Sequence, residues 1–156
     1  VNRSISFLMR LPMGIIEAVC TSTKKGMVKQ AQKRVELKKD WGICEDAHAG
    51  AWHRQVSLLA VESIDQVRKI LPSLKNGAFA ENLVTRGIDL NTLPVGSRLR
   101  VGESVVLQIT QIGKECHNSG CAIKKATGDC IMPKEGLFAK VLEGGYVEPS
   151  NKIWAI

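Results

Sequence analysis

The sequence has few aromatic residues and no long hydrophobic run. Phe, Trp and Tyr together make up 4% of the 156 residues, and none of them falls in the most basic segment, residues 24–39. Proteins that bind single-stranded nucleic acids stack bases on aromatic side chains, so the composition argues against a nucleic acid partner. No apolar run approaches the ~20 residues that a membrane-spanning helix needs, which argues against a membrane protein.

The sequence also lacks a secretory signal and an even set of cysteines. Residues 1–12 hold a short apolar patch with two arginines but no long hydrophobic region and no cleavage site. We interpret residues 1–13 as an N-terminal extension, disordered or not native, with Met13 as a candidate start. Five cysteines without a signal argue against a disulfide framework and favour a reducing, cytoplasmic location.

What the sequence does contain is the pattern of a mainly β domain. The hydrophobic content of 44% and charged content of 24% are typical of a globular protein, and the length suits one domain, residues 14–156. Many short β-type segments between Gly and Pro turns predict a barrel or sandwich rather than a parallel α/β sheet. The expected strands are residues 15–22, 28–37, 55–60, 81–85, 98–101, 105–112, 137–142 and 152–156.

One helix is expected among these strands, over Glu62–Leu71. Ile64, Val67, Ile70 and Leu71 recur at helical spacing and predict one buried face. Pro72 marks the end of the helix, because the residue before a proline resists the α conformation.

The net charge of +7 comes almost entirely from residues 24–39. This segment holds seven Lys or Arg and a single acid, Glu36, for a local net charge of 7 − 1 = +6. Two interpretations stay open. The segment is either the solvated face of a strand pair or a surface that attracts an anion such as a phosphate-bearing ligand.

The chemically richest stretch follows the apolar segment 105–112. Lys114, Cys116, His117 and Cys121 occur within eight positions after Gly113. A lysine and an imidazole near Cys116 favour its thiolate, which is the nucleophilic and metal-binding form. The alternative is a solvent-facing loop with incidental cysteines. Cys20, in contrast, lies in an apolar segment and is predicted to be a small core residue.

A second polar cluster lies at residues 44–54. Asp46 is placed to orient His48 through a hydrogen bond to one ring nitrogen, and Arg54 to hold a phosphate or carboxylate with two N–H groups. A polar loop whose groups satisfy one another is the competing interpretation. A zinc site is not expected, because the cysteines lack a paired C-x-x-C spacing. The candidate ligands of such a site are Cys116, His117 and Cys121, completed by Cys44, His48 or Cys130.

The stretch from Gly77 to Gly96 is predicted to be turn, strand, turn and loop. Glu81 and Asn82 are interpreted first as buried groups that tie loops together. Arg86 either has a structural role or faces an anionic ligand.

These motifs together resemble the MOSC family, the C-terminal domain of molybdenum cofactor sulfurase. The resemblance rests on the Asp46-Ala-His48-Ala-Gly50…Arg54-Gln-Val56 motif and on a cysteine-bearing strand end, Gln111 through Cys116. It rests also on Gly77-x-Phe-x-Glu-Asn-Leu-x-Thr-x-Gly-Ile and Leu93-Pro-Val-Gly-x-Arg-Leu-Arg-Val-Gly102. The motifs occur in the family order and span about residues 14–156.

The sequence departs from the family pattern at several positions. Glu45 and Ala80 stand where glycine is commoner in the family, and the usual Gln-Pro-Arg-x-Pro-Cys run appears as Gln111-Ile-Gly-Lys-Glu-Cys116. This variant looks more like the stand-alone bacterial members.

The resemblance implies a MOSC-type β-barrel with a few short helices and a role in binding the pterin-based molybdenum cofactor or relaying its sulfur. It implies Cys116 as the cofactor-facing thiol and possible molybdenum ligand, tuned by His117 and Lys114. The cofactor-binding residues would be Asp46, His48, Arg54, Arg86 and Cys121. A sulfur donor protein or a molybdoenzyme would be the partner.

The sequence lacks the aminotransferase-like domain that supplies pyridoxal phosphate chemistry in full sulfurases, so binding or relay is expected rather than persulfide formation. The other classes left open are a non-catalytic metal- or anion-binding module and a thiol redox protein.

Overall fold

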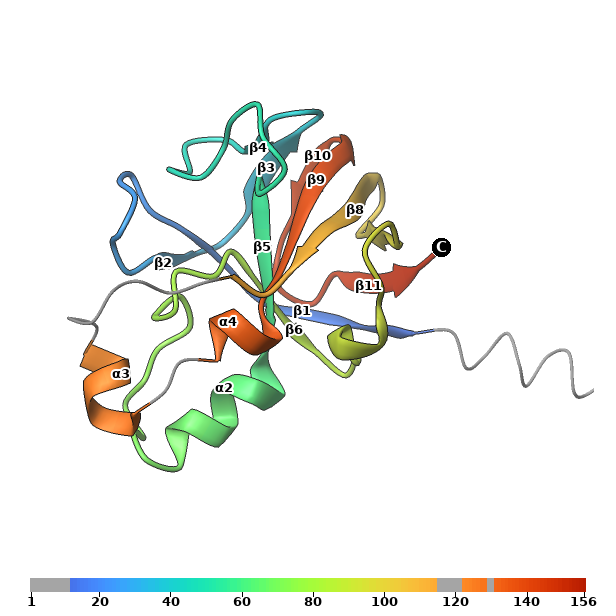
Figure 1. Ribbon diagram of the computed structural model, residues 1–156. Coiled ribbons are helices and arrows are strands. Elements are labelled where there is room, and N and C mark those ends of the chain that lie inside the picture. The colour runs from blue at the N-terminus through green and yellow to red at the C-terminus, as the bar shows by residue number, and fades with distance from the viewer. Residues whose placement is uncertain (1–11, 115–121, 129–130) are drawn as a thin grey trace, which may run out of the picture.

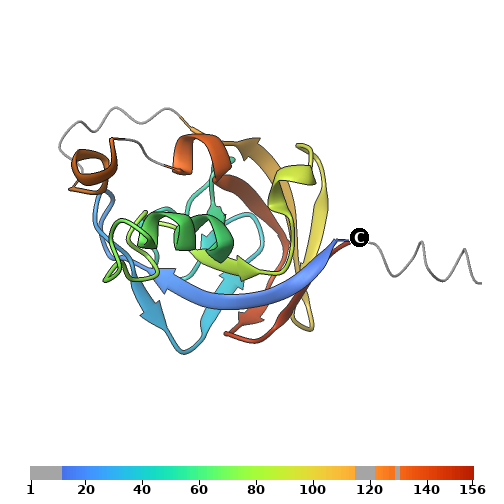
Figure 2. The same ribbon diagram turned by 90° about the horizontal axis from the view of Figure 1, so that it is seen from below.

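A computed structural model describes residues 12–114, 122–128 and 131–156. It shows a closed β-barrel with helices packed against one side (Figures 1 and 2). Seven strands form the ring in the order β11-β7-β8-β9-β5-β6-β1, and β1 closes it by pairing with β11. The predicted mainly β, barrel-like fold is confirmed.

The strand boundaries follow the turns of the sequence closely. The strands of the ring are β1 (Met13–Thr21), β5 (Val56–Ala60), β6 (Leu83–Arg86), β7 (Arg98–Val101), β8 (Val105–Ile112), β9 (Leu137–Glu143) and β11 (Lys152–Ala155). The strand β2 (Gln30–Gln32) extends the sheet beyond β1. A separate three-stranded sheet is formed by β3 (Val35–Lys38), β4 (Gly42–Ile43) and β10 (Gly145–Val147).

All pairs in the ring are antiparallel except β5–β6. Parallel neighbours need a crossover connection, which the helix α2 (Val61–Arg68) provides. The other helices are short: the 3₁₀ helix η1 (Leu90–Thr92), α3 (Ala122–Thr127) and α4 (Met132–Glu135). No helix in the described ranges is long and apolar enough to cross a membrane.

Two hydrophobic clusters explain why four of the five residues of β5 are apolar. Val56 and Leu58 belong to the cluster that fills the barrel, whereas Leu59 belongs to a second cluster between the barrel wall and the helices. A strand covered on both faces has no polar side. The second cluster also contains Cys20, which is fully buried as predicted, and burial raises the pKa of its thiol to about 12.

The helix α2 is shorter than predicted. It ends at Arg68, and Ile64 is buried as expected, but Ile70 lies beyond the helix and is 60% exposed. The expected apolar face over Glu62–Leu71 is therefore wrong at Ile70, because the chain leaves the helical path before that residue could turn toward the core.

The loop after Gly77 holds β1, β5 and the basic segment together. A side chain at Gly77, whose φ is +94°, would meet the backbone of Lys29, and the two backbones are joined by a 3.0 Å hydrogen bond from Lys29 N to Gly77 O. Glu81 accepts hydrogen bonds from the backbone N–H groups of Gly77 and Phe79, and Asn82 joins Ser57 of β5 to the Cys20 carbonyl of β1. The structural interpretation of Glu81 and Asn82 is confirmed.

Glu45 and Ala80, which stand where glycine is commoner in the family that the sequence resembles, both lie on left-handed backbone. Glu45 has a φ of 67° and Ala80 a φ of 62°. Only glycine adopts this conformation without steric cost, since a β-carbon costs about 1–2 kcal/mol there. A glycine would adopt the backbone conformation of either position without this cost.

We predict that Glu45→Gly and Ala80→Gly each stabilise the protein by about 0.5–1 kcal/mol. Relief of the left-handed strain exceeds the roughly 0.4–1 kcal/mol by which glycine favours the unfolded chain. Urea unfolding at neutral pH measures the difference. The control is Ala31→Gly in strand β2, which relieves no strain and should destabilise. Destabilisation of all three variants alike would contradict the strain at residues 45 and 80.

Candidate functional site

A cavity of about 250 Å³ opens where the loop of residues 44–54, the Gly77 loop and the ends of β8 and β9 meet. Its charged and imidazole lining groups are Lys25, His48, Arg54 and Lys114, and the rest of the lining is Trp52, Ser57, Ala80, Asn82, Met132 and Phe138. No carboxylate is among these lining residues. Three cations and an imidazole therefore surround a space with no negative charge in its described wall.

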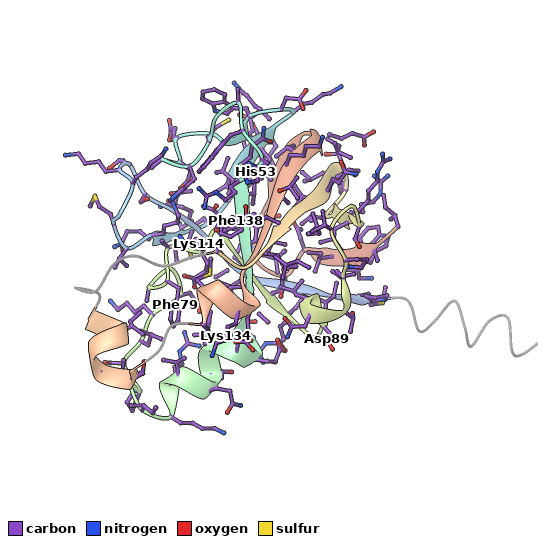
Figure 3. All side chains as sticks on the ribbon, in the orientation of Figure 1. His53, Phe79, Asp89, Lys114, Lys134 and Phe138 are labelled. Carbon is purple, nitrogen blue, oxygen red and sulfur yellow. The ribbon has the colours of Figure 1, made fainter. Side chains whose placement is uncertain are left out.

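Two aromatic rings hold the cations in place. The Arg54 guanidinium carbon lies 4.7 Å from the Trp52 ring centre and 5.7 Å from that of Phe138. Lys25 Nζ lies over Trp52 at 5.0 Å, and Lys114 Nζ over Phe138 at 5.9 Å. Figure 3 shows Lys114 beside Phe138, with His53 nearby in the same view. Ring faces attract cations, so these contacts favour this placement of the charges.

Arg54 has a donor that the described part of the protein does not satisfy. Its Nε is buried and has no hydrogen bond partner there. A buried donor without an acceptor costs about 1–3 kcal/mol, so the position favours an acceptor from outside the described residues. An oxyanion in the cavity would supply one.

Beneath the cavity lies a buried polar cluster built around Lys29. Lys29 Nζ lies 2.8 Å from Asp46 Oδ1, 3.0 Å from Ser22 Oγ and 2.9 Å from His48 Nδ1. The side chains of Lys29 and Asp46 are both fully buried. Sequence reasoning missed this role of Lys29, because the basic segment was interpreted as a surface and its contact with Asp46 spans 17 residues.

Asp46 does not contact the His48 ring in the way the sequence predicted. The distance from Asp46 Oδ2 to His48 Nδ1 is 3.9 Å, too long for a hydrogen bond. Asp46 Oδ2 accepts a hydrogen bond from the His48 backbone N–H instead. The hydrogen bond partner of the His48 ring at Nδ1 is Lys29 Nζ. Asp46 thus orients His48 through the backbone and through Lys29, from below the cavity rather than as part of its lining.

The His48 ring is neutral at physiological pH. Burial, with the nearby Lys29 ammonium as the next cause, lowers the pKa of His48 from 6.5 to about 4. Lys114 and Lys25 lower it further, and Asp46 opposes them.

This shift predicts a loss of stability in mild acid. Between pH 6.5 and pH 4 the unfolded chain protonates His48 while the native protein does not, so stability falls as the pH falls, by up to about 3 kcal/mol. Urea unfolding at pH 7 and pH 4.5 of the wild type and His48→Asn measures this contribution as the difference between their pH dependences. Equal pH dependences would contradict a buried, neutral His48.

The remaining predicted site residues divide into two groups. Arg86 is not among the residues that line the cavity; it forms a two-bond ion pair with Glu17, at 2.9 and 3.0 Å. Cys116, His117 and Cys121 lie outside the described residues, as does Cys130. The described ranges contain no group of three potential metal ligands. They do not include Cys116, His117, Cys121 and Cys130, so most of the candidate zinc ligands lie outside this statement.

Lys114 is the last described residue before Cys116, and it lines the cavity. The described chain resumes at residue 122 with α3, and it reaches the cavity again at Met132. Nearby, Gly136 O accepts a 2.6 Å hydrogen bond from Gly113 N. Described residues on both sides of the cysteine-bearing segment, Lys114 and Met132, thus line this cavity.

The comparison with known proteins agrees with the sequence motifs. The family model described as the MOSC domain matches residues 45–153. This chain belongs to the MOSC domain family. The match covers the loop of residues 44–54 from Glu45 on, the Gly77 loop and the strands β8 and β9, which build most of the cavity wall in this MOSC domain.

Solved structures show the same fold at low sequence identity. The YuaD protein from Bacillus subtilis aligns with a TM-score of 0.75 and 18% identity, over 90% of this chain and 94% of that one. YiiM from Geobacillus stearothermophilus aligns with a TM-score of 0.65 and 16% identity, over 93% of this chain and 75% of that one. YiiM from Escherichia coli aligns with a TM-score of 0.56 and 19% identity, over 95% of this chain and 70% of that one. A search of curated proteins found no match to this MOSC sequence.

Proposed function

We propose that this MOSC domain binds the pterin-based molybdenum cofactor by its phosphate in the cationic cavity, with Cys116 as the thiol that faces the cofactor. The observation that carries the proposal is the buried Arg54 Nε, which has no partner among the described residues. It lies in a cavity lined by Lys25 and Lys114 and free of carboxylates in its described wall. The family membership adds the cofactor class.

The residues present fit such a group in charge and in part in size. Planar guanidinium and flexible ammonium groups are the usual ligands of phosphate oxygens. The volume of about 250 Å³ lies below the ~300–1,000 Å³ of pockets that enclose a drug-sized molecule. The cavity therefore suits the phosphate-bearing end of the cofactor, and the remainder would extend beyond it.

Each residue then has a defined task. Arg54 would hold phosphate oxygens, with its orientation fixed by Trp52 and Phe138. Lys25 and Lys114 would neutralise the remaining charge. When bound, the cofactor supplies a soft metal centre for which a thiolate is a suitable ligand. Cations near Cys116, beginning with Lys114 two positions before it, would favour the thiolate form.

Sulfur relay through Cys116 is the finer part of the proposal. It would need a sulfur donor protein and a molybdoenzyme as acceptor, both in a reducing cytoplasm where a thiol persists. A carrier that binds the anionic cofactor without transferring sulfur is the second candidate, since the cationic cavity alone supports it.

The test is the molybdenum and pterin content of protein purified from a molybdenum-replete host. We expect about one equivalent in the wild type and at least a tenfold loss in Arg54→Met, because the variant removes the buried donor and one charge. The matched control is Arg86→Met, an arginine outside the cavity lining, which should keep its cofactor. Wild-type protein without pterin, or equal loss in both variants, would refute the proposal.

A further inference from the structure

Lys29 is buried more completely than its chemistry favours. Its relative exposure is 1%, and lysines are rarely buried unless paired. Its ammonium has three N–H groups and three contacts, to Asp46, Ser22 and His48. The contact to Asp46 neutralises the charge. The contact to His48 has a different consequence.

An ammonium group only donates hydrogen bonds, so each of its partners must accept one. Ser22 Oγ donates its own proton to Lys24 O at 3.1 Å, so its oxygen accepts the hydrogen bond from Lys29. His48 Nδ1, 2.9 Å from Lys29 Nζ, must therefore carry a lone pair. A neutral imidazole with its acceptor at Nδ1 has its proton at Nε2.

The free edge of the ring faces away from this cluster. Lys29 and Asp46, at the Nδ1 edge, are fully buried, whereas the His48 side chain is 23% exposed and lines the cavity. Within the described residues Nε2 has no hydrogen bond partner. The exposed, unpaired edge of the ring is thus the one that carries the N–H.

The geometry points to Lys29 as a positioning residue that fixes His48 in the Nε2–H form and directs this N–H into the cavity as a neutral donor to a bound oxyanion. The inference rests on the proposed function for the identity of the oxyanion, but the ring state itself is a property of the protein without ligand. It adds to the cavity a donor that carries no charge and cannot be lost by deprotonation in the physiological range.

The surrounding structure holds Lys29 and the His48 loop in this arrangement. The Lys29 backbone is tied to Gly77, and Asp46 accepts hydrogen bonds from the Ser22 and His48 backbone N–H groups, each at 3.1 Å. Trp52 Nε1 donates to the His48 carbonyl at 2.8 Å. The ring is therefore constrained through the backbone on one side and through Lys29 on the other.

The first test is nitrogen NMR of the histidine rings in ligand-free protein at pH 7. We expect His48 to show an unprotonated Nδ1 and a protonated Nε2 in a single tautomer. The double variant Lys29→Met/Asp46→Asn removes the ammonium without leaving a buried charge, and it should give a tautomer mixture. A purely structural role for Lys29 would leave the tautomer unchanged. That result, or a wild-type His48 protonated at Nδ1, overturns the inference.

The second test separates the two edges of the ring. His48→Asn keeps an acceptor near the position of Nδ1 but removes the Nε2–H, whereas His48→Gln keeps a donor near the position of Nε2. Titrated with inorganic phosphate, His48→Asn should bind about tenfold more weakly than the wild type, and His48→Gln should retain more of the affinity. The reverse order overturns the inference. A wild type that shows the expected tautomer but binds no phosphate refutes the proposed function instead.

Discussion

Replacing Asp46 by alanine is expected to lower the free energy of unfolding by about 3–5 kcal/mol, because it leaves the Lys29 ammonium buried without a counter-charge. The two groups are 2.8 Å apart and neither side chain is exposed. The variant also removes the acceptor for the Ser22 and His48 backbone N–H groups. Urea unfolding measures the loss without the ionic screening that guanidinium would add.

The double variant Lys29→Met/Asp46→Asn is the matched control. It removes both charges, and asparagine keeps an acceptor for one of the two backbone N–H groups. It should therefore stay within about 1–2 kcal/mol of the wild type, as neutral replacements of buried ion pairs often do. A cost below about 1 kcal/mol for Asp46→Ala would show that Lys29 reaches water in solution. It would then contradict the buried cluster itself.

The second large effect concerns Cys116. Cys116→Ala is expected to abolish cofactor binding or sulfur loading while leaving the unfolding free energy within about 1 kcal/mol of the wild type, if the thiol acts as a ligand or sulfur carrier. Cys121→Ala is the matched control and should do less, unless the two thiols form a relay through a transient disulfide. Molybdenum, pterin and labile sulfur content of the purified proteins measure the effect.

Thiol reactivity gives an independent check. Iodoacetamide near neutral pH should alkylate Cys116 faster than Cys20, whose buried thiol has a pKa of about 12. Full cofactor and sulfur loading in Cys116→Ala would contradict the proposed thiol role. Arg54 and the lysines of the cavity would then remain as the binding site of a carrier.

The sequence predicted the barrel well where local pattern decides structure. Arg98–Val101 and Val105–Ile112 are strands with the expected boundaries, because glycine turns at both sites limit an alternating apolar segment. The expected strand 28–37 instead divides into β2 and β3, which belong to different sheets. Residues 145–147 form the strand β10, which is not among the expected strands. Whether these residues form a strand, and in which sheet, depends on pairing with a strand that is distant in sequence. The local sequence carries no signal of that pairing.

The cavity was only partly predictable. Residue type and family motif indicated His48, Arg54 and Lys114, and the structure brings all three together. Arg86 shares their chemistry, but it is paired with Glu17 and does not line the cavity. In the sequence, Lys29 cannot be told from the surface cations of residues 24–39. The burial of Lys29 depends on its contacts with the Gly77 loop and with Asp46, both of which are distant in sequence. Trp52 and Phe138 gain their role only when the fold places their rings beside Arg54.

The most direct test of the central claim is a titration of ligand-free protein with inorganic phosphate, followed by the nitrogen NMR signals of the arginine side chains. The account predicts that the Arg54 Nε–H signal shifts on binding, because phosphate supplies the acceptor that this buried group lacks in the described part of the protein. The Arg86 Nε–H signal, already bonded to Glu17, should stay in place. An Arg54 signal that does not respond to phosphate, or responds no more than Arg86, would contradict the cavity as an oxyanion site.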